Sequence, residues 1–464
     1  MPEKMNSQSD GNDAGREFTL ESTRLPIWEP ILWLFFMLFE RLASLRRSIL
    51  AHEKGISTIS RLKTKGPTES RPISSMWVFA ATIGELNAIE PLLNEIIAKR
   101  KELTLVLLTD HPEYLTVFQN RYLDAEVFHV SGGYREAEAL AEQYLPIECL
   151  LAEIPILLSD SPARLGYSTI RVAKKYGAVC VVLNGWLYKQ KPSSFSARLE
   201  VFLFRLCFLR IFDLILVQTK EVEQDLLREG ADSNRIVVTG NVKYDALETI
   251  RKDSLRIDTD PILNAVRTCN RPCIIASSVT GEWEQERVLD GYCIARDQCA
   301  TNPLLIIVPR YPNMKEKLTQ LEGFIRSRGL AHELKTKIVP EDLMELDVLV
   351  LNTTGELRRY FAFAKIVYMG VNHNVLEPLA FSKPVLVSDG WVMGFPSYPV
   401  YHALVENNCL IVTRDASEIG AEIAFLLKNS TDYDKAIEHI SETLLARRGA
   451  VSRSMQELER LKFD

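Results

Sequence analysis

Short apolar runs and amphipathic stretches alternate along most of the chain. Between residues 76 and 241 the apolar runs have the length of buried strands, and several intervening stretches repeat apolar positions with helical spacing. The strands predicted here are 76–81, 103–108, 126–130, 149–152, 179–183, 214–218 and 236–239, with helices between them such as 86–99, 168–176 and 221–229. Strands that alternate with helices predict an α/β domain with an open parallel sheet.

A second alternating set follows a weaker boundary near residues 251–261. Its predicted strands are 273–276, 304–308, 337–339, 348–351, 366–369, 384–387 and 410–412, and one long helix is predicted over 435–461. The pattern divides the chain into an N-terminal Rossmann-like domain, 76–245, a C-terminal Rossmann-like domain, 246–434, and a C-terminal helix, 435–464. Such sheets bind ligands at the carboxyl ends of their strands, so two of them predict a ligand in the cleft where they face each other.

The first 75 residues lack this alternation. Residues 1–25 are mostly polar and are predicted to be a disordered tail, and 53–75 has the composition of a linker. Between them, 26–52 joins an apolar stretch to Arg41, Arg46 and Arg47. That stretch is shorter than the roughly 20 residues that cross a bilayer. It predicts a membrane-associated helix lying in the headgroups, and a helix packed on the protein is the alternative.

Composition and charge limit the classes of function. Hydrophobic residues make up 47% of the 464 residues and charged residues 25%, which is ordinary for a folded protein with sizeable cores. The net charge of -6 gives no reason to expect nucleic acid as a partner. The 8 cysteines are scattered without paired zinc-like spacing, which indicates reduced thiols in the cytoplasm. The sequence has no paired Asp motif for a nucleotide-bound divalent ion, so no metal is implied.

The stretch 77–96, WVFAATIGELNAIEPLLNEI, places an acid where a predicted strand becomes a helix. Glu85 directly follows Gly84 at the carboxyl end of the strand, on the side of the predicted cleft. A carboxylate held there can take a proton from a ligand hydroxyl. The alternative is that Glu85 is only a helix-start acid, stabilised by the helix dipole.

Several stretches, taken in chain order, resemble one family. They are AATIGELNA, LLAEIPILL, VVLNGWLY, VTGNVKYD, ASSVTGEWEQE, IIVPRYPN, NTTGELRRYFAFAKIVYMG and HNVLEPLAFSKPVLV. From about residue 27 to the C-terminus the chain is similar to the 3-deoxy-D-manno-octulosonic acid (Kdo) transferases. The resemblance implies a GT-B fold and inverting transfer of Kdo from CMP-Kdo to a lipid A precursor or another glycolipid. It also implies the cytoplasmic face of the bacterial inner membrane, and no cofactor besides the CMP-sugar donor.

The resemblance further implies roles for individual residues. Glu85 is the implied general base, and Glu377 is implied to accept hydrogen bonds from the ribose hydroxyls. The implied donor-binding residues are Ser278, Gly281, Arg310, Thr354, Gly355, Glu356, Leu357, Asn374 and Glu377. The implied acceptor or cleft residues are Gly84, Glu153, Asn184, Asn241 and Lys243.

At most of these positions the residue type and its place in the predicted elements also suggest a function, together with a purely structural alternative. The backbone N–H groups of 355–357 follow a predicted strand and suit a phosphate, whereas a plain turn capped by Thr354 is the alternative. Arg310 suits an anion, or is a surface arginine. Lys243 favours an anionic ligand, or is a solvated lysine at a hinge. Glu153 is a second cleft carboxylate, or a strand-end acid.

Three remaining features of the sequence each allow a functional and a structural interpretation. Asn374 and Glu377 are three residues apart and are expected on one helical face, although Glu377 also suits a plain helix start. Ser278 and Gly281 suit a loop over the donor, or simply a turn. The aromatic, arginine-containing stretch 196–213 is predicted to be a helix, either resting on the membrane or buried between the domains.

The chain departs from the family pattern mainly at the sugar end of the site. Trp186 and Tyr188 replace Arg and Ser, Tyr311 replaces His, Asn352 replaces Asp, and 370–374 is shortened. Three hypotheses follow: a CMP-Kdo-dependent transferase or a paralogue with a changed acceptor, a UDP-sugar-dependent GT-B enzyme, and a degenerate non-catalytic member acting as a membrane-attached binding protein. The preference for CMP over UDP and the effect of replacing Glu85 separate them.

Overall fold

The structure is a computed structural model that describes residues 30, 31, 34 and 72–461, except for 110, 131–133, 154–162, 188–208, 255–259, 313, 394 and 396. The predicted tail 1–25, nearly all of the predicted membrane-associated helix 26–52 and most of the stretch 196–213 lie outside these residues. Ile31 and Leu34 are helical and exposed. Within the described part of the chain, no helix is both long enough and apolar enough to cross a membrane.

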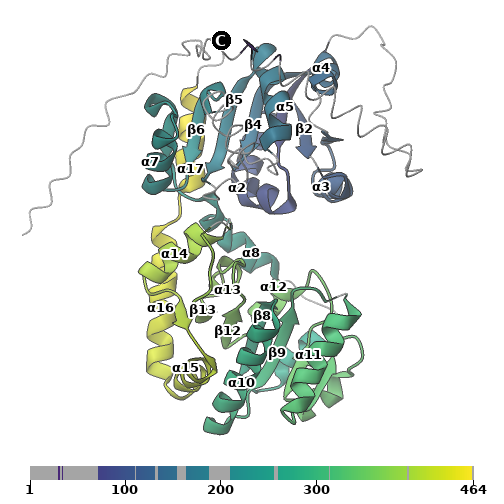
Figure 1. Ribbon diagram of the computed structural model, residues 1–464, viewed down its shortest axis with the longest axis vertical. Coiled ribbons are helices and arrows are strands. Elements are labelled where there is room, and N and C mark those ends of the chain that lie inside the picture. The colour runs from purple at the N-terminus through teal and green to yellow at the C-terminus, as the bar shows by residue number, and fades with distance from the viewer. Residues whose placement is uncertain are drawn as a thin grey trace, which may run out of the picture.

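The N-terminal domain is built on a seven-stranded parallel sheet (Figure 1). Its strands are β1 Ile73–Phe79, β2 Thr104–Thr109, β3 Glu126–His129, β4 Tyr144–Ala152, β5 Val179–Gly185, β6 Leu214–Val217 and β7 Ile236–Val238, in the order β3-β2-β1-β4-β5-β6-β7. The helices are α2 Ile83–Lys99, α3 Leu115–Arg121, α4 Tyr134–Gln143, α5 Ala163–Lys175 and α7 Lys220–Arg228. All seven predicted strands are confirmed, and the order of the first six is that of a doubly wound Rossmann sheet.

The C-terminal domain repeats this architecture. Its strands are β8 Cys273–Val279, β9 Leu304–Pro309, β10 His332–Leu334, β11 Val348–Val350, β12 Ile366–Met369, β13 Val385–Ser388 and β14 Ile411–Thr413, in the order β10-β11-β9-β8-β12-β13-β14. Its helices are α8 Leu247–Ser254, α9 Pro261–Thr268, α10 Glu282–Gln298, α11 Lys315–Ser327, α12 Leu357–Phe361, α13 Leu376–Leu379, α14 Tyr398–Glu406, α15 Ala416–Lys428 and α16 Ser430–Ala446. The predicted Rossmann-like architecture is therefore confirmed for both domains.

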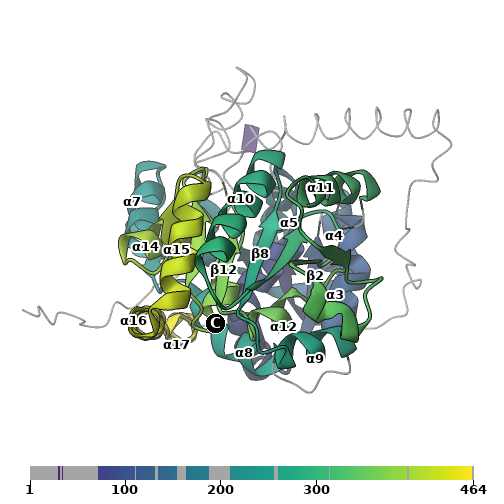
Figure 2. The same ribbon diagram turned by 90° about the horizontal axis from the view of Figure 1, so that it is seen from below.

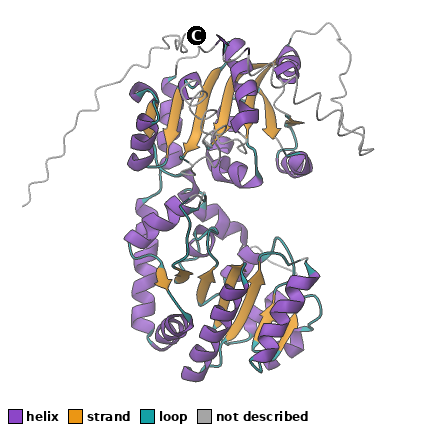
Figure 3. Ribbon diagram, viewed as in Figure 1, coloured by secondary structure: helices purple, strands orange, loops and turns teal. Residues whose placement is uncertain are grey.

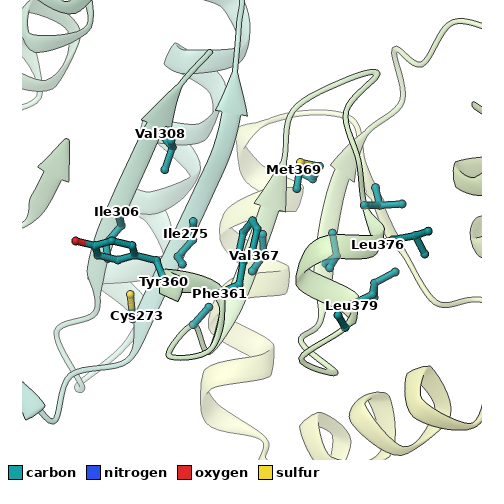
Figure 4. Close-up of a cluster of buried hydrophobic side chains, with 14 of the residues drawn as sticks. Cys273, Ile275, Ile306, Val308, Tyr360, Phe361, Val367, Met369, Leu376 and Leu379 are labelled. Carbon is teal, nitrogen blue, oxygen red and sulfur yellow. The ribbon is translucent and has the colours of Figure 1, made fainter. Parts of the chain in front are cut away.

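Each sheet has a hydrophobic core on both of its faces, because alternate strand residues point to opposite sides. In β8, Cys273 and Ile275 enter one core while Ile274 and Ala276 enter the other. Figure 2 places α10, α11 and α15 over one face of this sheet and α8, α9 and α12 over the other. Figure 4 labels part of the second core, formed by Cys273, Ile275, Ile306, Val308, Tyr360, Phe361, Val367, Met369, Leu376 and Leu379.

The carboxyl ends of the two sheets face each other across the space between the domains (Figure 3). Every βα loop that follows a strand is therefore at this boundary, whichever domain it belongs to. This arrangement turns the strand ends of both halves of the chain toward the same space.

One predicted strand is wrong. Residues 337–339 are not extended in the sheet, and the edge strand is β10, His332–Leu334, which pairs with β11. The apolar pair Ile338 and Val339 suggested a strand, but the chain turns over Lys335–Lys337 and only Ile338 enters the core, while Val339 is exposed. A run this short does not distinguish an edge strand from a turn followed by one core residue.

The single C-terminal helix predicted over 435–461 is also wrong. The chain forms α16 and then α17, Ala450–Arg460, with Gly449 between them in the left-handed region at φ 91°. A left-handed glycine ends a helix readily because it has no Cβ. Helix α17 packs beside α2 in the core of the N-terminal domain through Ala450, Met455 and Leu458 (Figure 1).

Candidate active site

Glu85 lies in the first turn of α2, directly after the short connection from β1. Its backbone N–H donates to Thr82 Oγ1 at 3.2 Å, and its carboxylate Oε2 accepts from Ala81 N–H at 2.7 Å. These two bonds form a reciprocal cap of the kind in which a residue in the first helical turn reaches back to a free amide. Gly84 is exposed, and a Cβ there would meet only Thr82 Oγ1, at 3.6 Å. The helix-start interpretation of Glu85 is therefore realised, and its role as a base stays a prediction.

A buried polar network joins four of the predicted cleft residues, Glu153, Asn184, Asn241 and Lys243, to Gln218. Glu153 Oε1 accepts from Lys243 Nζ at 2.9 Å, from Asn184 Nδ2 at 3.2 Å and from Gln218 Nε2 at 3.4 Å. Gln218 Nε2 also donates to the Asn184 carbonyl, and Gln218 Oε1 accepts from Asn241 Nδ2 at 2.9 Å. Asn184 Oδ1 accepts from Val242 N–H. Residues far apart in sequence therefore form one hydrogen-bonded unit.

The strand ends that carry this network have unusual backbone conformations. Glu153 has φ 49° and Asn184 has φ 55°, both in the left-handed region that non-glycine residues seldom adopt. Such conformations cost on the order of 1 kcal/mol each. They place both side chains inward, with Glu153 and Asn184 almost fully buried. Strained, buried polar groups at the ends of parallel strands are typical of functional sites.

Sequence analysis missed Gln218. Gln218 directly follows the apolar strand β6 and is buried. Its network partners lie at or just beyond the ends of β4, β5 and β7. A polar residue at the carboxyl end of a buried strand was the available signal. Trp186, which stands where the family has Arg, is buried in the core of the N-terminal domain.

On the donor side, the loops after β8, β9 and β12 meet around His373. Thr280 Oγ1 lies 3.2 Å from His373 Nε2 and donates to the Ser278 carbonyl, while Ser278 itself has φ 57°. Arg310 is exposed at the end of β9, and its charge acts on the His373 ring. Ser278 and Arg310, which were predicted separately, therefore flank one histidine that the sequence analysis did not single out.

Glu284 fixes this group of loops. Its carboxylate accepts from Thr280 N–H, Val371 N–H and Tyr368 OH at 3.0 to 3.2 Å, and burial raises its pKa against the effect of these bonds. Gly281 is the residue before α10, and Glu284 lies in the first turn of that helix. The predicted Gly281 turn is thus held by a buried carboxylate rather than by a side-chain cap of its own.

The turn 354–357 after β11 is partly open to solvent. Thr354 and Gly355 are exposed, Gly355 has φ 86°, and Leu357 begins the five-residue helix α12. The Glu356 carboxylate pairs with Lys335, which also pairs with Asp260. Because α12 is so short, its dipole is small, and an anion would meet individual N–H groups of the turn instead.

Asn374 and Glu377 do not share a helical face as predicted. Asn374 precedes α13, and its Oδ1 accepts from the N–H of Leu376, the first residue of that helix, at 3.1 Å. Glu377 Oε1 accepts two bonds from Arg358, from Nε at 3.1 Å and from Nη2 at 2.8 Å. These hydrogen bonds join Glu377, in α13, to Arg358, in α12.

The predicted residues form three groups on the facing strand ends. Glu85 and Gly84 are at β1, the polar network is at β4 to β7, and the donor residues are at β8, β9, β11 and β12, in strands that neighbour one another. Among the described residues, no group of three or more His, Cys, Asp or Glu side chains is placed to hold a metal ion.

We expect the protein to lose stability between about pH 6.5 and about pH 4 in part through His373. Burial and then Arg310 lower the pKa of His373 to about 4, so the unfolded chain binds a proton that the folded chain excludes. The contribution of neutral His373 is complete above pH 6.5 and is lost as the pH falls toward 4. Melting temperatures of the wild type and His373→Gln at about pH 7.5 and about pH 5 measure it. Equal drops in the two proteins would contradict it.

No protein-family profile matches the chain. Among curated proteins, the 3-deoxy-D-manno-octulosonic acid transferase of Bordetella pertussis is 24% identical over 386 residues, 77% of this chain and 80% of the relative. The transferase of the same name from Haemophilus influenzae is 29% identical over 242 residues, 50% of this chain and 52% of the relative. That of Chlamydia muridarum is 23% identical over 333 residues, 67% of this chain and 69% of the relative. Over as much as 77% of its length the chain is therefore similar to Kdo transferases, at low sequence identity.

Kdo transferases are glycosyltransferases. Solved structures of other proteins share the two-domain fold. A UDP-GlcNAc 2-epimerase from Neisseria meningitidis has a TM-score of 0.58 at 15% identity, covering 84% of this chain and 99% of that chain. A glycosyltransferase from Rickettsia africae has a TM-score of 0.56 at 13% identity, with the same coverage. These similarities establish the GT-B arrangement of the two Rossmann-like domains.

Proposed function

We propose that the protein transfers Kdo, or a related acidic sugar, from its CMP-activated form to a lipid A precursor or a related glycolipid. The observation that carries the proposal is the position of the family motifs, which lie on the facing carboxyl ends of two Rossmann sheets. The names of the relatives support Kdo as the sugar. The C-terminal domain would hold the donor, and the N-terminal domain the acceptor.

In the proposed reaction Glu85 acts as the general base. It takes the proton from an acceptor hydroxyl as that oxygen attacks the anomeric carbon of Kdo. The bond between the anomeric carbon and the phosphate oxygen breaks, and CMP leaves with the bonding electron pair. One displacement inverts the anomeric carbon. CMP is a good leaving group, so no strong general acid is needed.

Donor binding is assigned to the loops of the C-terminal domain. Arg310 would neutralise the donor phosphate or the Kdo carboxylate, and the N–H groups around Gly355 would bind phosphate oxygens. The second carboxylate oxygen of Glu377 would accept from the ribose while Arg358 holds the first. His373 would stay neutral near pH 7, so Arg310 supplies the positive charge next to it.

The acceptor side is assigned to Gly84, Glu85 and the polar network. Lys243 would attract an anionic acceptor group, and Glu153 would fix the direction of its side chain. We further propose a peripheral position on the cytoplasmic face of the bacterial inner membrane, through the segment 26–52 that the sequence predicts to be a membrane-associated helix. The exposed Ile31 and Leu34 side chains support an apolar contact there.

A transfer assay tests the proposal. The purified full chain would receive freshly generated CMP-Kdo and a tetraacylated lipid A precursor in anionic vesicles, with products read by mass spectrometry. We expect a mass gain of one or more Kdo units, protein that pellets with the vesicles, and inhibition by CMP at lower concentration than by UDP. Absence of transfer from protein that still binds CMP would contradict this sugar and acceptor. Tighter binding of UDP would favour the UDP-sugar hypothesis instead.

A further inference from the structure

The two passages of the chain between the domains are tied to each other. The first runs through 239–245 and the second through 446–453, at the break between α16 and α17. Asp245 Oδ1 accepts from Gly449 N–H and Oδ2 accepts from Val451 N–H, both at 2.6 Å. Arg453 Nε donates to the Thr239 carbonyl at 2.8 Å. Any change in the angle between the domains must bend the chain at this pair of passages.

A pocket of about 270 Å³ lies at this hinge. One side is lined by Gln218 and Thr219 at the end of β6 and by three residues of the first passage, Gly240, Asn241 and Tyr244. The first turns of α14 line the other side. Arg447 and Arg453 of the second passage complete the wall. The pocket therefore contacts both domains at once, and none of its lining residues is an Asp or Glu.

Within the part of the chain that the structure describes, the hydrogen bonds of the two pocket arginines go only to neutral carbonyl groups, and the Arg447 guanidinium also lies over the Tyr244 ring, 5.9 Å from its centroid. Arg447 Nη2 donates to the Ala403 carbonyl, and Arg453 donates to the carbonyls of Thr239 and Arg448. Over the described residues neither of them forms an ion pair within 4 Å, whereas the neighbouring Arg448 pairs with Glu248 at 3.5 Å. Two guanidinium groups without a carboxylate between them attract an anion, and their forked geometry suits phosphate.

Two hydroxyl groups add neutral donors to this wall. Tyr244 lines the pocket and is buried, and burial raises its pKa to about 12, so its hydroxyl keeps its proton at neutral pH. Thr219 Oγ1 accepts from Val222 N–H and still has a proton to donate. The lining therefore combines two cations with two residues that carry hydroxyl groups, a composition that suits a phosphate group with its several acceptor oxygens.

We propose that the hinge pocket binds a phosphate group, either as free phosphate or as part of a phosphorylated sugar. The pocket is separate from the loops assigned to the donor, but it shares Gln218 and Asn241 with the polar network on the proposed acceptor side. Its two arginines have no role in the proposed transfer reaction. A phosphate here would join Arg447 of the C-terminal domain to Arg453, which packs with the N-terminal domain. Binding would thus favour one angle between the domains, and with it one width of the cleft.

Calorimetric titration tests the site. The full chain, saturated with CMP to occupy the donor loops, would be titrated with inorganic phosphate and separately with glucose 6-phosphate. We expect Arg447→Gln to weaken binding at least tenfold. The matched control is Arg448→Gln, which removes the same charge one residue away, outside the pocket, and should change the affinity less than twofold. Ala403→Leu, which fills the pocket without changing its charge, should also abolish binding.

The outcomes separate the sources of the phosphate. Binding of both probes with similar affinity would identify free phosphate as sufficient, and tighter binding of the sugar phosphate would identify a phosphorylated carbohydrate. Equal losses of phosphate affinity in Arg447→Gln and Arg448→Gln would show that binding depends only on the overall positive charge, which would overturn the site. Failure of the wild type to bind either probe would also overturn it. Melting temperatures would verify that each variant folds. If Arg447→Gln does not fold, Ala403→Leu still tests whether phosphate binds in the pocket.

Discussion

Glu85→Gln is expected to lower kcat for sugar transfer by about 10²- to 10⁴-fold, with little change in stability. Glutamine cannot take a proton from the acceptor hydroxyl, and loss of a general base typically costs that much. Its side-chain oxygen can still accept the bond from Ala81 N–H, so the cap of α2 survives. Initial rates with CMP-Kdo and the lipid A precursor, together with melting temperatures, measure the two effects separately.

The chain provides a matched control at the start of α15. Glu418 makes the same reciprocal cap, since its N–H donates to Asp415 and its Oε2 accepts from Arg414 N–H at 2.8 Å. Glu418→Gln should leave kcat within about twofold, because this helix follows the edge strand β14 and has no proposed role in transfer. Equal activity of Glu85→Gln and the wild type would leave Glu85 as a helix cap and remove the proposed base. Glu85→Ala alone could not decide this, because it also removes the cap.

Lys243→Met is expected to lower the free energy of unfolding of the N-terminal domain by about 3 kcal/mol. The lysine provides the only cation within 4 Å of Glu153 over the described part of the chain, and the Glu153 side chain is only 5% exposed. Removing one member of a buried ion pair leaves an uncompensated charge, which typically costs about 3 to 5 kcal/mol. The lower end applies because Lys243 is partly exposed. Urea denaturation, with hydrogen exchange of β4 and β5 peptides, would measure the loss in this domain.

Two variants control this result. The double variant Glu153→Gln/Lys243→Met also removes the unpaired buried carboxylate, so it should recover part of the lost free energy of unfolding. Lys220→Met makes the same substitution in an exposed pair with Glu223 and should cost less than about 0.5 kcal/mol. A loss in Lys243→Met no larger than in Lys220→Met would show that the network does not depend on the ion pair.

The fold was largely accessible from the sequence because its signal is local. The runs 76–81 and 214–217 are continuously apolar, as expected when both faces of a parallel sheet are covered. The prediction over 337–339 was wrong because three residues carry too little pattern to separate a strand from a turn. The single helix over 435–461 was wrong because the apolar pattern continues past Gly449, while the left-handed glycine breaks the helix.

The candidate site was accessible only in part. The position of Glu85 at a strand end and the family motifs could be read directly from the sequence. The contact of Glu153 with Lys243 could not be predicted from the sequence. The network joins residues at the ends of four strands, and only the strand order of the sheet shows that these ends are neighbours. Gln218 carries no recognisable motif, so its part in the network appears only in three dimensions.

The sequence by itself determined two α/β domains, nearly all of their strands and the resemblance to the Kdo transferases, because burial and motif spacing are properties of short segments. The tertiary structure decided which polar residues share a network and where the final helix packs. It also decided that Arg447 and Arg453 face one pocket at the hinge. These outcomes depend on strand order and on the return of the chain to the N-terminal domain, and neither is encoded in the pattern of any one segment.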